Sequence, residues 1–358
     1  MRAQGVVVIT SGFPRRSETF ALNELLALEN SGLLAGIFAT KPGDGLSPQP
    51  GSERLLHRLE VLAPGRPDEQ AAAVTARLTG RIIRGIHAYF AHTPAEVASN
   101  VARRLGVPYS FSVHARDARK VDRDTLTTRI RRAAGVIACN TDVAQDLSFG
   151  GNRIRVVPHG VDLERFEPRP LPVRQPLRLL AVGRLVEKKG FDVLLAAVAR
   201  LALPFRLQIV GEGPERERLA AAIAVGALGD RVTLCGGRTH ADMPDLYANA
   251  HVVVVPSVAD SSGDRDGLPN VVLEALASQR PVVASAIAAI PNAVIPEKTG
   301  ILVPPRDVTA LADALTSLAS RPDLGERLGA EGRRWVEHAY DLRRCTDQFC
   351  RAIETIHA

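Results

Sequence analysis

Short apolar runs alternate with helix-length segments along the whole chain of 358 residues. Residues 6–10 form such a run before a helix-length segment over residues 18–31, and the same order continues to a last helix-length segment over 342–357. This alternation is typical of parallel β-sheets flanked by helices. A single hydrophobic core stops growing near ~250–300 residues. We therefore expect an α/β protein whose two Rossmann-like domains face each other across a cleft, with ligands beyond the carboxyl ends of the strands.

A proline-rich stretch divides the chain. Residues 158–176 contain five prolines, and proline is excluded from helix interiors and central strands. The predicted parts are an N-terminal domain over 1–165, a linker over 166–176, a C-terminal domain over 177–339 and a C-terminal helix over 340–358 that packs back on the N-terminal domain. Residues 41–56, which are rich in Pro, Gly and Ser, are predicted to form a mobile loop.

The positive charge of the chain is unevenly distributed. The net charge of +6 lies entirely within the first 165 residues and is densest between Arg116 and Arg132. One interpretation is a solvated helix face. The other is a surface that meets anionic lipid or a phosphate-bearing acceptor, which would place the protein peripherally at the inner face of the membrane.

Other features of the composition exclude several classes of protein. Aromatic residues make up only 4% of the chain, which argues against a carbohydrate-binding module or a single-strand nucleic-acid platform, so no nucleic-acid partner is expected. The four cysteines lack metal-ligand spacing and are expected to be reduced thiols of a cytoplasmic protein. No apolar run reaches ~18 residues, so no transmembrane helix is expected.

Residues 266–275 place two carboxylates beside the start of a predicted helix. An apolar run over 251–255 and a polar loop over 256–265 precede Pro269, which suits a first helical turn. The free N–H groups and the dipole of such a terminus favour an anion. Asp266 and Glu274 are therefore better suited to accept hydrogen bonds from hydroxyl groups. An anion site beside hydroxyl-binding carboxylates predicts a nucleotide-sugar ligand.

A basic pair follows the first apolar run of the second half. Arg184 and Lys189 flank the turn between the predicted strand over 177–182 and the next helix. Two cations and free N–H groups at this turn could hold a diphosphate without a metal ion. Taken alone, the pair could equally face solvent and bind nothing.

In this order and spacing, the motifs of the chain resemble the retaining GT-B glycosyltransferases of family 4, in particular their exopolysaccharide and colanic-acid branch. The segments that carry the resemblance are Ser17-Glu18-Thr19-Phe20 with Asn23-Glu24, Ser112-Val113-His114-Ala115-Arg116-Asp117, Val156-Val157-Pro158-His159-Gly160-Val161-Asp162, residues 183–195, Gly211-Glu212-Gly213-Pro214, residues 266–274 and residues 299–305. One departure is Asp266, which stands where the family commonly has Glu and which we expect to affect donor preference.

The resemblance implies a role for individual residues of the C-terminal domain. Glu274 would bind the ribose hydroxyls, and Asp266 would contact the transferred sugar. Arg184 and Lys189 would neutralise the diphosphate. The remaining donor-binding residues would be Gly267 and Leu268 through their backbone N–H groups, with Pro269 and Gly237.

The resemblance also assigns residues of the N-terminal domain. His114 would reach toward the donor sugar and join Arg184, Lys189 and Asp266 as a catalytic residue. We expect His159 to be a structural hinge residue. The acceptor would lie near Gly12, Arg15, Glu18 and His92.

The reaction implied is transfer of a hexose from a UDP- or GDP-linked donor to a hydroxyl acceptor, with retention by front-face attack and without a metal or other cofactor. A lipid-linked or oligosaccharide acceptor in cell-surface polysaccharide or glycolipid synthesis is the first expectation. A natural-product or small-metabolite acceptor is the alternative.

Three rival interpretations remain open at this point. Asp264-Arg265-Asp266 matches the Asp-x-Asp metal signature of a different glycosyltransferase fold. The Gly211-x-Gly213 turn is reminiscent of a nicotinamide-binding enzyme, although Gly-x-Gly-x-x-Gly is not completed. A degenerate transferase that serves as a scaffold or sugar-binding partner is the third.

Overall fold

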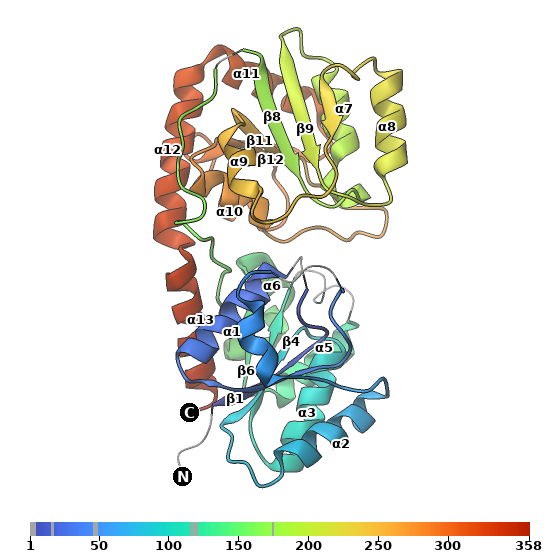
Figure 1. The fold of residues 1–358 in the computed structure, drawn as a ribbon, viewed down its shortest axis with the longest axis vertical. Helices are drawn as coiled ribbons and strands as arrows, with labels where there is room; N and C mark the ends of the chain where they lie inside the picture. The colour runs from blue at the N-terminus through green and yellow to red at the C-terminus, as the bar shows by residue number, and fades with distance from the viewer. Residues whose placement is uncertain (1–4, 16–17, 46–48, 115–116, 118–120, 174) are drawn as a thin grey trace. The chain divides into compact units, whose positions relative to one another are not determined.

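A computed structural model describes residues 5–15, 18–45, 49–114, 117, 121–173 and 175–358 (Figure 1). The chain forms two compact units. Unit 1 consists of Met1–Gly160 and Arg343–Ala358, and unit 2 consists of Val161–Leu342. Each unit is an α/β domain built on one parallel sheet. Five residues of the predicted motifs and of the predicted basic stretch lie outside the described residues, namely Ser17, Ala115, Arg116, Arg119 and Lys120.

Unit 1 contains a seven-stranded parallel sheet in the order β3-β2-β1-β4-β5-β6-β7. The order reverses between β1 and β4, and ligands of open α/β sheets bind at such a switch point, beyond the carboxyl ends of the strands. The strands are β1 (Val6–Thr10), β2 (Leu34–Ala39), β3 (Leu59–Val61), β4 (Gly85–Tyr89), β5 (Tyr109–Val113), β6 (Gly135–Ala138) and β7 (Ile154–Val156).

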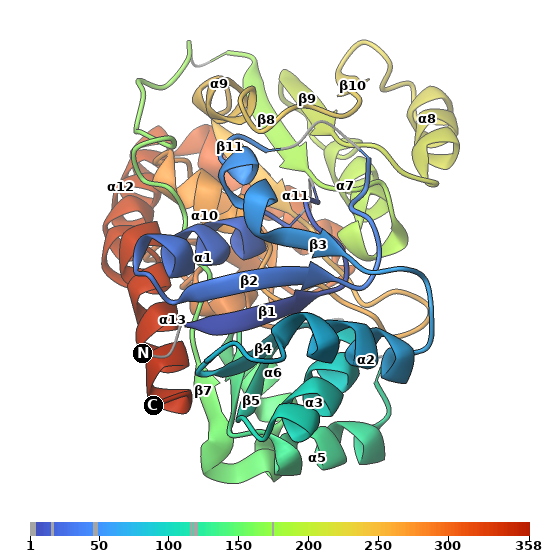
Figure 2. The ribbon, with the colours of Figure 1, turned by 60° about the horizontal axis from the view of Figure 1, so that its bottom comes forward.

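Helices cover both faces of the unit 1 sheet (Figure 2). Val7 and Ile9 of β1 pack toward α2, α3 and α5, while Val6 and Val8 pack toward α1 and α13. Because alternate residues of a strand point to opposite faces, a strand between two helical layers is apolar throughout. The helices are α1 (Thr19–Asn30), η1 (Ser52–Arg58), α2 (Pro67–Leu78), α3 (Thr93–Leu105), α5 (Arg123–Arg132), α6 (Thr141–Asp146), η2 (Ser148–Arg153) and α13 (Leu342–Ile356).

The last helix of the chain belongs to the core of unit 1. Phe349 and Ile353 of α13 are buried beside Leu25 and Leu28 of α1. At its end, His357 Nε2 lies 2.8 Å from Ser110 Oγ of β5, and His87 of β4 contacts the same hydroxyl at 2.7 Å. The helix is therefore anchored by both apolar packing and a buried polar cluster.

Unit 2 contains a six-stranded parallel sheet in the order β10-β9-β8-β11-β12-β13. Its order reverses between β8 and β11, so the turn after β8 lies at the switch point. The strands are β8 (Leu177–Val182), β9 (Phe205–Val210), β10 (Val232–Leu234), β11 (Val252–Val255), β12 (Val282–Ser285) and β13 (Gly300–Val303).

Two hydrophobic clusters fill the two sides of the unit 2 sheet. The helices α7, α8 and α11 contribute to one cluster, and α9, α10 and α12 contribute to the other. The helices are η3 (Glu187–Lys189), α7 (Phe191–Val198), α8 (Arg216–Val225), α9 (Met243–Ala248), α10 (Asn270–Ala277), η4 (Ile290–Asn292), α11 (Val308–Ser320) and α12 (Pro322–Ala339).

The side chain of Arg280 anchors the proline-rich stretch to unit 2. Arg280 is 1% exposed and donates hydrogen bonds to the carbonyl oxygens of Tyr247 (2.9 Å), Ala248 (3.1 Å), Arg169 (2.8 Å) and Pro170 (3.3 Å). Burial lowers the pKa of this guanidinium to about 10. These bonds tie Arg169 and Pro170 to the core of unit 2.

The structure corrects part of one sequence prediction. Residues 52–56 of the predicted mobile loop over 41–56 are helical, because they begin the 3-10 helix η1. Leu55 of η1 is fully buried in unit 1 and supplies the apolar anchor that a mobile loop lacks.

Among the residues that the structure describes, no helix has the length and apolar character needed to cross a membrane.

Candidate functional site

Glycines bring the backbone turns at the switch point of unit 2 close together. A Cβ atom on Gly211 would lie 1.9 Å from the carbonyl oxygen of Gly183, and one on Gly213 would lie 2.3 Å from that of Leu185. A Cβ on Gly183 would meet the Lys189 side chain at 3.0 Å, so the stem of Lys189 lies against this glycine. The turns after β8 and β9 thereby form one compact surface at the carboxyl ends of the strands.

The cations of this surface pair with the carboxylates that precede α10. Lys189 Nζ lies 2.6 Å from Asp266 Oδ2, and Lys188 Nζ lies 3.5 Å from Asp266 Oδ1 and 3.1 Å from Asp264 Oδ2. Burial alone would raise the pKa of Asp266, but Lys189 and Lys188 outweigh that effect and lower it. The structure thus brings together Lys189 and Asp266, as predicted from the sequence, and adds Lys188. The adjacent Lys188-Lys189 pair was the available signal for this residue.

Arg184 lies on the same turn, but its side chain is exposed. It forms no ion pair with any residue that the structure describes. Its predicted role toward a diphosphate stays a prediction. A side chain of this length on an exposed turn is free to move toward a bound anion.

The start of α10 presents unpaired backbone donors beside these charges. Pro269 is the N-cap residue of α10, and the N–H groups of Gly267 and Leu268 donate to no group in the described part of the chain. Such N–H groups and the helix dipole favour an anion. The predicted donor-binding residues Gly267, Leu268 and Pro269 therefore lie next to the Lys189–Asp266 pair.

Glu274 is held on α10 by two side chains that the sequence analysis did not identify. The Tyr247 hydroxyl donates to Glu274 Oε2 at 2.7 Å, and His240 Nε2 lies 3.8 Å from Oε1. Tyr247 is fully buried, and burial raises its pKa well above 10, reinforced by the adjacent carboxylate. Tyr247 is therefore a neutral donor that orients Glu274. No local motif links these residues, because they come from different elements.

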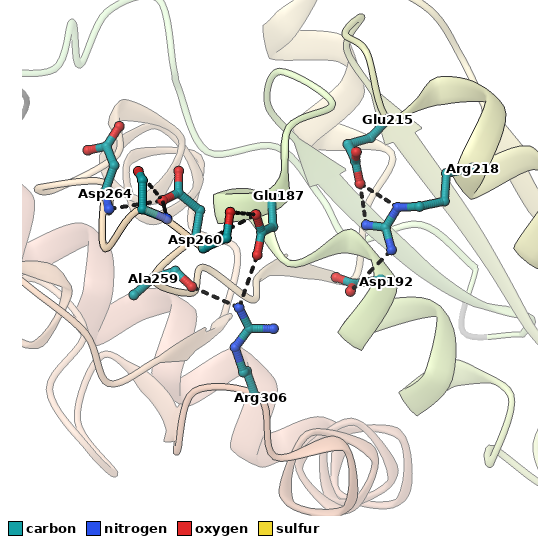
Figure 3. A network of polar contacts seen from close by, with 10 residues as sticks. Glu187, Asp192, Glu215, Arg218, Ala259, Asp260, Asp264 and Arg306 are labelled. Atoms are coloured by element: carbon teal, nitrogen blue, oxygen red, sulfur yellow. Dashed lines mark hydrogen bonds and ion pairs between the residues drawn. The ribbon is translucent and has the colours of Figure 1, made fainter.

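The loop between β11 and α10 is tied to the cationic turn by Glu187 (Figure 3). Glu187 Oε2 accepts from the Ser261 N–H at 3.1 Å and from its hydroxyl at 3.0 Å. Arg306 bridges the two segments, 3.5 Å from Glu187 Oε1 and 2.8 Å from the Ala259 carbonyl oxygen. Within the loop, Asp260 accepts from the Asp264 N–H at 3.0 Å. These bonds fix the carboxylates that meet Lys188 and Lys189.

Gly237, which the sequence predicts to be a donor-binding residue, lies after β10. Its N–H donates to Glu212 Oε1 at 3.2 Å, and Gly236 before it adopts a φ of 73°. Its contact with a donor stays a prediction.

In unit 1, His114 follows β5 at the carboxyl edge of the sheet. Its ring lies 4.6 Å from the Phe20 ring and 5.0 Å from the Phe90 ring, measured between centroids. Asp117 Oδ2 lies 3.7 Å from Nδ1. Both ring nitrogens are buried without a hydrogen-bond partner among the described residues. Both ring nitrogens of His114 are therefore available to hydrogen-bond a ligand at the carboxyl edge of the unit 1 sheet.

The predicted acceptor residues lie along the same edge of unit 1. Arg15 pairs with Glu18 at 2.8 Å, and burial raises the pKa of Glu18. His92 Nε2 lies 3.9 Å from Asp117 Oδ1, and burial lowers the pKa of His92. Gly12 lies so close to Pro42 that a Cβ would come 2.6 Å from its carbonyl oxygen. Their contact with an acceptor stays a prediction.

The Asp264-Arg265-Asp266 carboxylates meet Lys188 and Lys189 in the structure. Across the described ranges, no group of three or more His, Cys, Asp or Glu residues is arranged to hold a metal ion.

Two family models match this chain, one in each half. The model described as Glycosyltransferase Family 4 matches residues 17–165, and the model described as Glycosyl transferases group 1 matches residues 176–321. The second match includes the cationic turn and the start of α10.

Curated proteins and solved structures match over nearly the full length. The chain is 28% identical to the putative colanic acid biosynthesis glycosyltransferase WcaL of Escherichia coli, over 92% of this chain and 94% of WcaL. It is 27% identical to the amylovoran biosynthesis glycosyltransferase AmsK of Erwinia amylovora, over 87% of this chain and 89% of AmsK. HepE of Anabaena, solved in complex with UDP, superposes with a TM-score of 0.82 and 17% identity, covering 98% of this chain and 100% of HepE. The fold is that of the GT-B glycosyltransferases.

Proposed function

The chain belongs to glycosyltransferase family 4, and we propose that it moves a hexose from a nucleotide-diphosphate sugar to a hydroxyl acceptor with retention of anomeric configuration. The observation that carries this proposal is the arrangement in unit 2. Lys189 and Asp266 form an ion pair beside the unpaired N–H groups of Gly267 and Leu268, and Glu274 lies about a turn and a half along α10. This arrangement offers cations and N–H groups to a diphosphate, and carboxylates to the hydroxyls of two sugars.

The donor is a UDP- or GDP-linked hexose, which is a co-substrate, and the proposal includes no cofactor. Glu274 accepts hydrogen bonds from the ribose, since Tyr247 occupies only one of its oxygens. Arg184 and Lys189 hold the diphosphate, and Gly237 lies near the base. The complex of HepE with UDP supports a uridine nucleotide as the first candidate.

In the proposed reaction, the bond between the anomeric carbon and the β-phosphate oxygen breaks while a bond to the acceptor oxygen forms on the same face. The acceptor proton passes to the departing phosphate oxygen, so no carboxylate of the chain becomes a nucleophile. Fixed positive charges aimed at the leaving group supply the main electrostatic stabilisation. Because lysine and arginine supply that charge, the proposed reaction is independent of metal ions. His114 is the proposed contact of unit 1 with the transferred sugar.

The acceptor is proposed to be lipid-linked or an oligosaccharide in the synthesis of a cell-surface polysaccharide or glycolipid. The names of WcaL and AmsK, which refer to colanic acid and amylovoran biosynthesis, support this class. Gly12, Arg15, Glu18 and His92 are its proposed contacts. The basic excess of the first 165 residues would bring the protein to the membrane surface that carries such an acceptor.

A binding screen tests the donor part of the proposal. UDP-, GDP- and ADP-linked hexoses are added separately, with and without EDTA, and the unfolding temperature is measured. A ligand at 100 times its Kd stabilises the folded state by about 2.7 kcal/mol. We expect one nucleotide class to stabilise the protein equally with and without chelator. No stabilisation by any nucleotide sugar, or stabilisation abolished by EDTA, would contradict the proposal.

A further inference from the structure

Three elements of unit 1 meet at the carboxylate of Glu24. Tyr89 of β4 donates its hydroxyl hydrogen to Glu24 Oε2 at 2.5 Å, and His159 Nδ1 lies 2.9 Å from Glu24 Oε1. Glu24 is 5% exposed, and Tyr89 is fully buried. Each oxygen of this buried carboxylate therefore has its own partner. A carboxylate keeps its charge in such a site only when a cation and hydrogen bonds compensate it.

His159 supplies that cation. Burial is the largest single influence and would lower its pKa, but the charge and hydrogen bond of Glu24, together with the Cys139 thiol, raise the pKa to about 10. Among the described residues, Glu24 on α1, His114 after β5 and the Cys139 thiol after β6 face the ring, and Tyr89 on β4 contacts the Glu24 carboxylate. Tyr89 stays neutral, since burial raises its pKa well above 10. Glu24 is thus the partner that keeps His159 charged.

One end of the His159 ring lacks a partner. Nε2 is buried and forms no hydrogen bond with a described residue. The Cys139 thiol is close enough to contribute to the raised pKa, but its geometry does not satisfy Nε2. A buried charged donor without an acceptor is costly, so a group that supplies one binds favourably.

The ring has the position of a binding residue. It stacks on Phe20, with centroids 4.4 Å apart and an interplanar angle of 23°, and lies parallel to the His114 ring at 5.3 Å. His114 has two buried ring nitrogens without partners. The two histidines follow β5 and β7, so they share the ligand-binding edge of the sheet.

We propose that His159 is a substrate-binding residue, held as an imidazolium by Glu24 and Tyr89, and that its Nε2–H donates to a hydroxyl oxygen of the acceptor beside His114. This inference rests on the proposed transferase function and names a contact within it. Because Glu24 already balances the charge of His159, the matching group is a neutral sugar hydroxyl. A ring that keeps its proton cannot act as a general base, so His159 orients the acceptor and takes no proton from it.

The protonation state of His159 can be measured by NMR, without an assay of enzyme activity. The full chain is labelled with ¹⁵N-histidine and titrated by NMR from pH 6 to 9, and the His159 signals are assigned by their loss in His159→Asn. The wild type should show an imidazolium throughout, whereas Glu24→Gln should show deprotonation near neutral pH. Glu29→Gln, on the same helix but paired with Arg58 at 2.8 Å, is the matched control and should leave His159 charged. A wild-type ring that titrates near pH 6.5 would overturn the proposal.

The contact is tested with octyl glucoside, galactoside and mannoside as acceptor probes, below their micelle concentrations. At least one probe should shift the His159 Nε2 signal of the wild type. Its KM should stay flat from pH 6 to 9 in the wild type and rise about tenfold with pH in Glu24→Gln, since a charged hydrogen bond is lost. The control Glu29→Gln should keep both the flat KM and the donor hydrolysis of the wild type. Two results would contradict the inference while leaving the proposed donor site unaffected. One is normal donor hydrolysis by a wild type whose His159 signal no probe shifts, and the other is a KM of Glu24→Gln that does not change with pH. If the wild type hydrolyses no nucleotide sugar, that result would instead contradict the proposed function.

Discussion

Lys189 Nζ lies 2.6 Å from Asp266 Oδ2. The cation proposed for the diphosphate and the carboxylate proposed for the transferred sugar therefore form one ion pair. A diphosphate must compete with Asp266 for Lys189, and the transferred sugar must compete with Lys189 for Asp266. An intact donor supplies a diphosphate for Lys189 and a sugar hydroxyl for Asp266 in the same binding event. We infer that this exchange couples recognition of the phosphate to recognition of the sugar.

Asp266→Asn is expected to separate these two roles. Removal of the carboxylate charge frees Lys189 for a diphosphate, so UDP or GDP should bind at least as tightly as to the wild type. Transfer should fall about 10²-fold, the size of effect seen when one electrostatic contact to a transition state is lost. Calorimetric titration of the nucleotide and the rate of transfer provide the two measurements. A parallel loss of nucleotide affinity and rate would argue against the exchange.

Glu274→Gln tests the proposed ribose contact. A hydrogen bond to a charged group is worth about 1.5–3 kcal/mol, so the affinity for the preferred nucleoside diphosphate should fall at least tenfold. Pyrophosphate, which has no ribose, should bind to the variant and to the wild type equally. Titration calorimetry with both ligands measures this difference. Equal losses for both ligands would assign Glu274 to the phosphates instead.

Gly211→Ala is expected to destabilise unit 2 by about 2–4 kcal/mol, because the new Cβ meets the Gly183 carbonyl oxygen at 1.9 Å and the residue has a φ of 149°. Gly229→Ala is the matched control, since its Cβ would have no atom within 4 Å, and its effect should stay within about 0.5 kcal/mol. Denaturant unfolding compares the two. Equal stability of both variants would show that the two turns are not packed as described.

Unit 1 is expected to lose stability in mild acid. Burial lowers the pKa of His357 to about 4 and that of His87 well below 6.5. As pH falls below 6.5, the unfolded chain binds protons at these residues before the folded chain does, so the free energy of unfolding decreases. For His357 the loss amounts to about 3 kcal/mol by pH 4. Denaturant unfolding from pH 7 to 4 should show a smaller loss in His357→Gln than in the wild type. The loss should be unchanged in His57→Gln, a control on an exposed side chain.

The sequence predicted most of the elements and the proximity of Lys189 to Asp266 in the candidate site. The alternating pattern predicted both sheets, because strands buried on both faces are apolar throughout. Lys189 and Asp266 could be placed together because each follows a strand at the same sheet edge. The helix α5 was anticipated only as one interpretation of the basic stretch between Arg116 and Arg132, since only Leu126 and Ile130 of its ten residues are buried and the apolar signal is weak.

Contacts that depend on the order of strands could not be predicted. Glu24, Tyr89 and His159 come from α1, β4 and the segment after β7, and only the folded sheet brings them together. The same holds for Tyr247 and Glu274. The burial of Leu55 could not be predicted either, because a single buried apolar residue within a Pro- and Gly-rich stretch produces no periodic pattern.

The most direct test of the proposed function compares Lys189→Met with Lys298→Met. Lys298 is an exposed lysine of unit 2 that lies over the Trp335 ring, away from the candidate site. Turnover of the preferred nucleotide sugar, as transfer or hydrolysis, is measured for both variants at equal folded concentration. We predict that Lys189→Met lowers turnover about 10²–10³-fold and that Lys298→Met retains wild-type turnover. Wild-type turnover in Lys189→Met would contradict the assignment of the donor site to this turn.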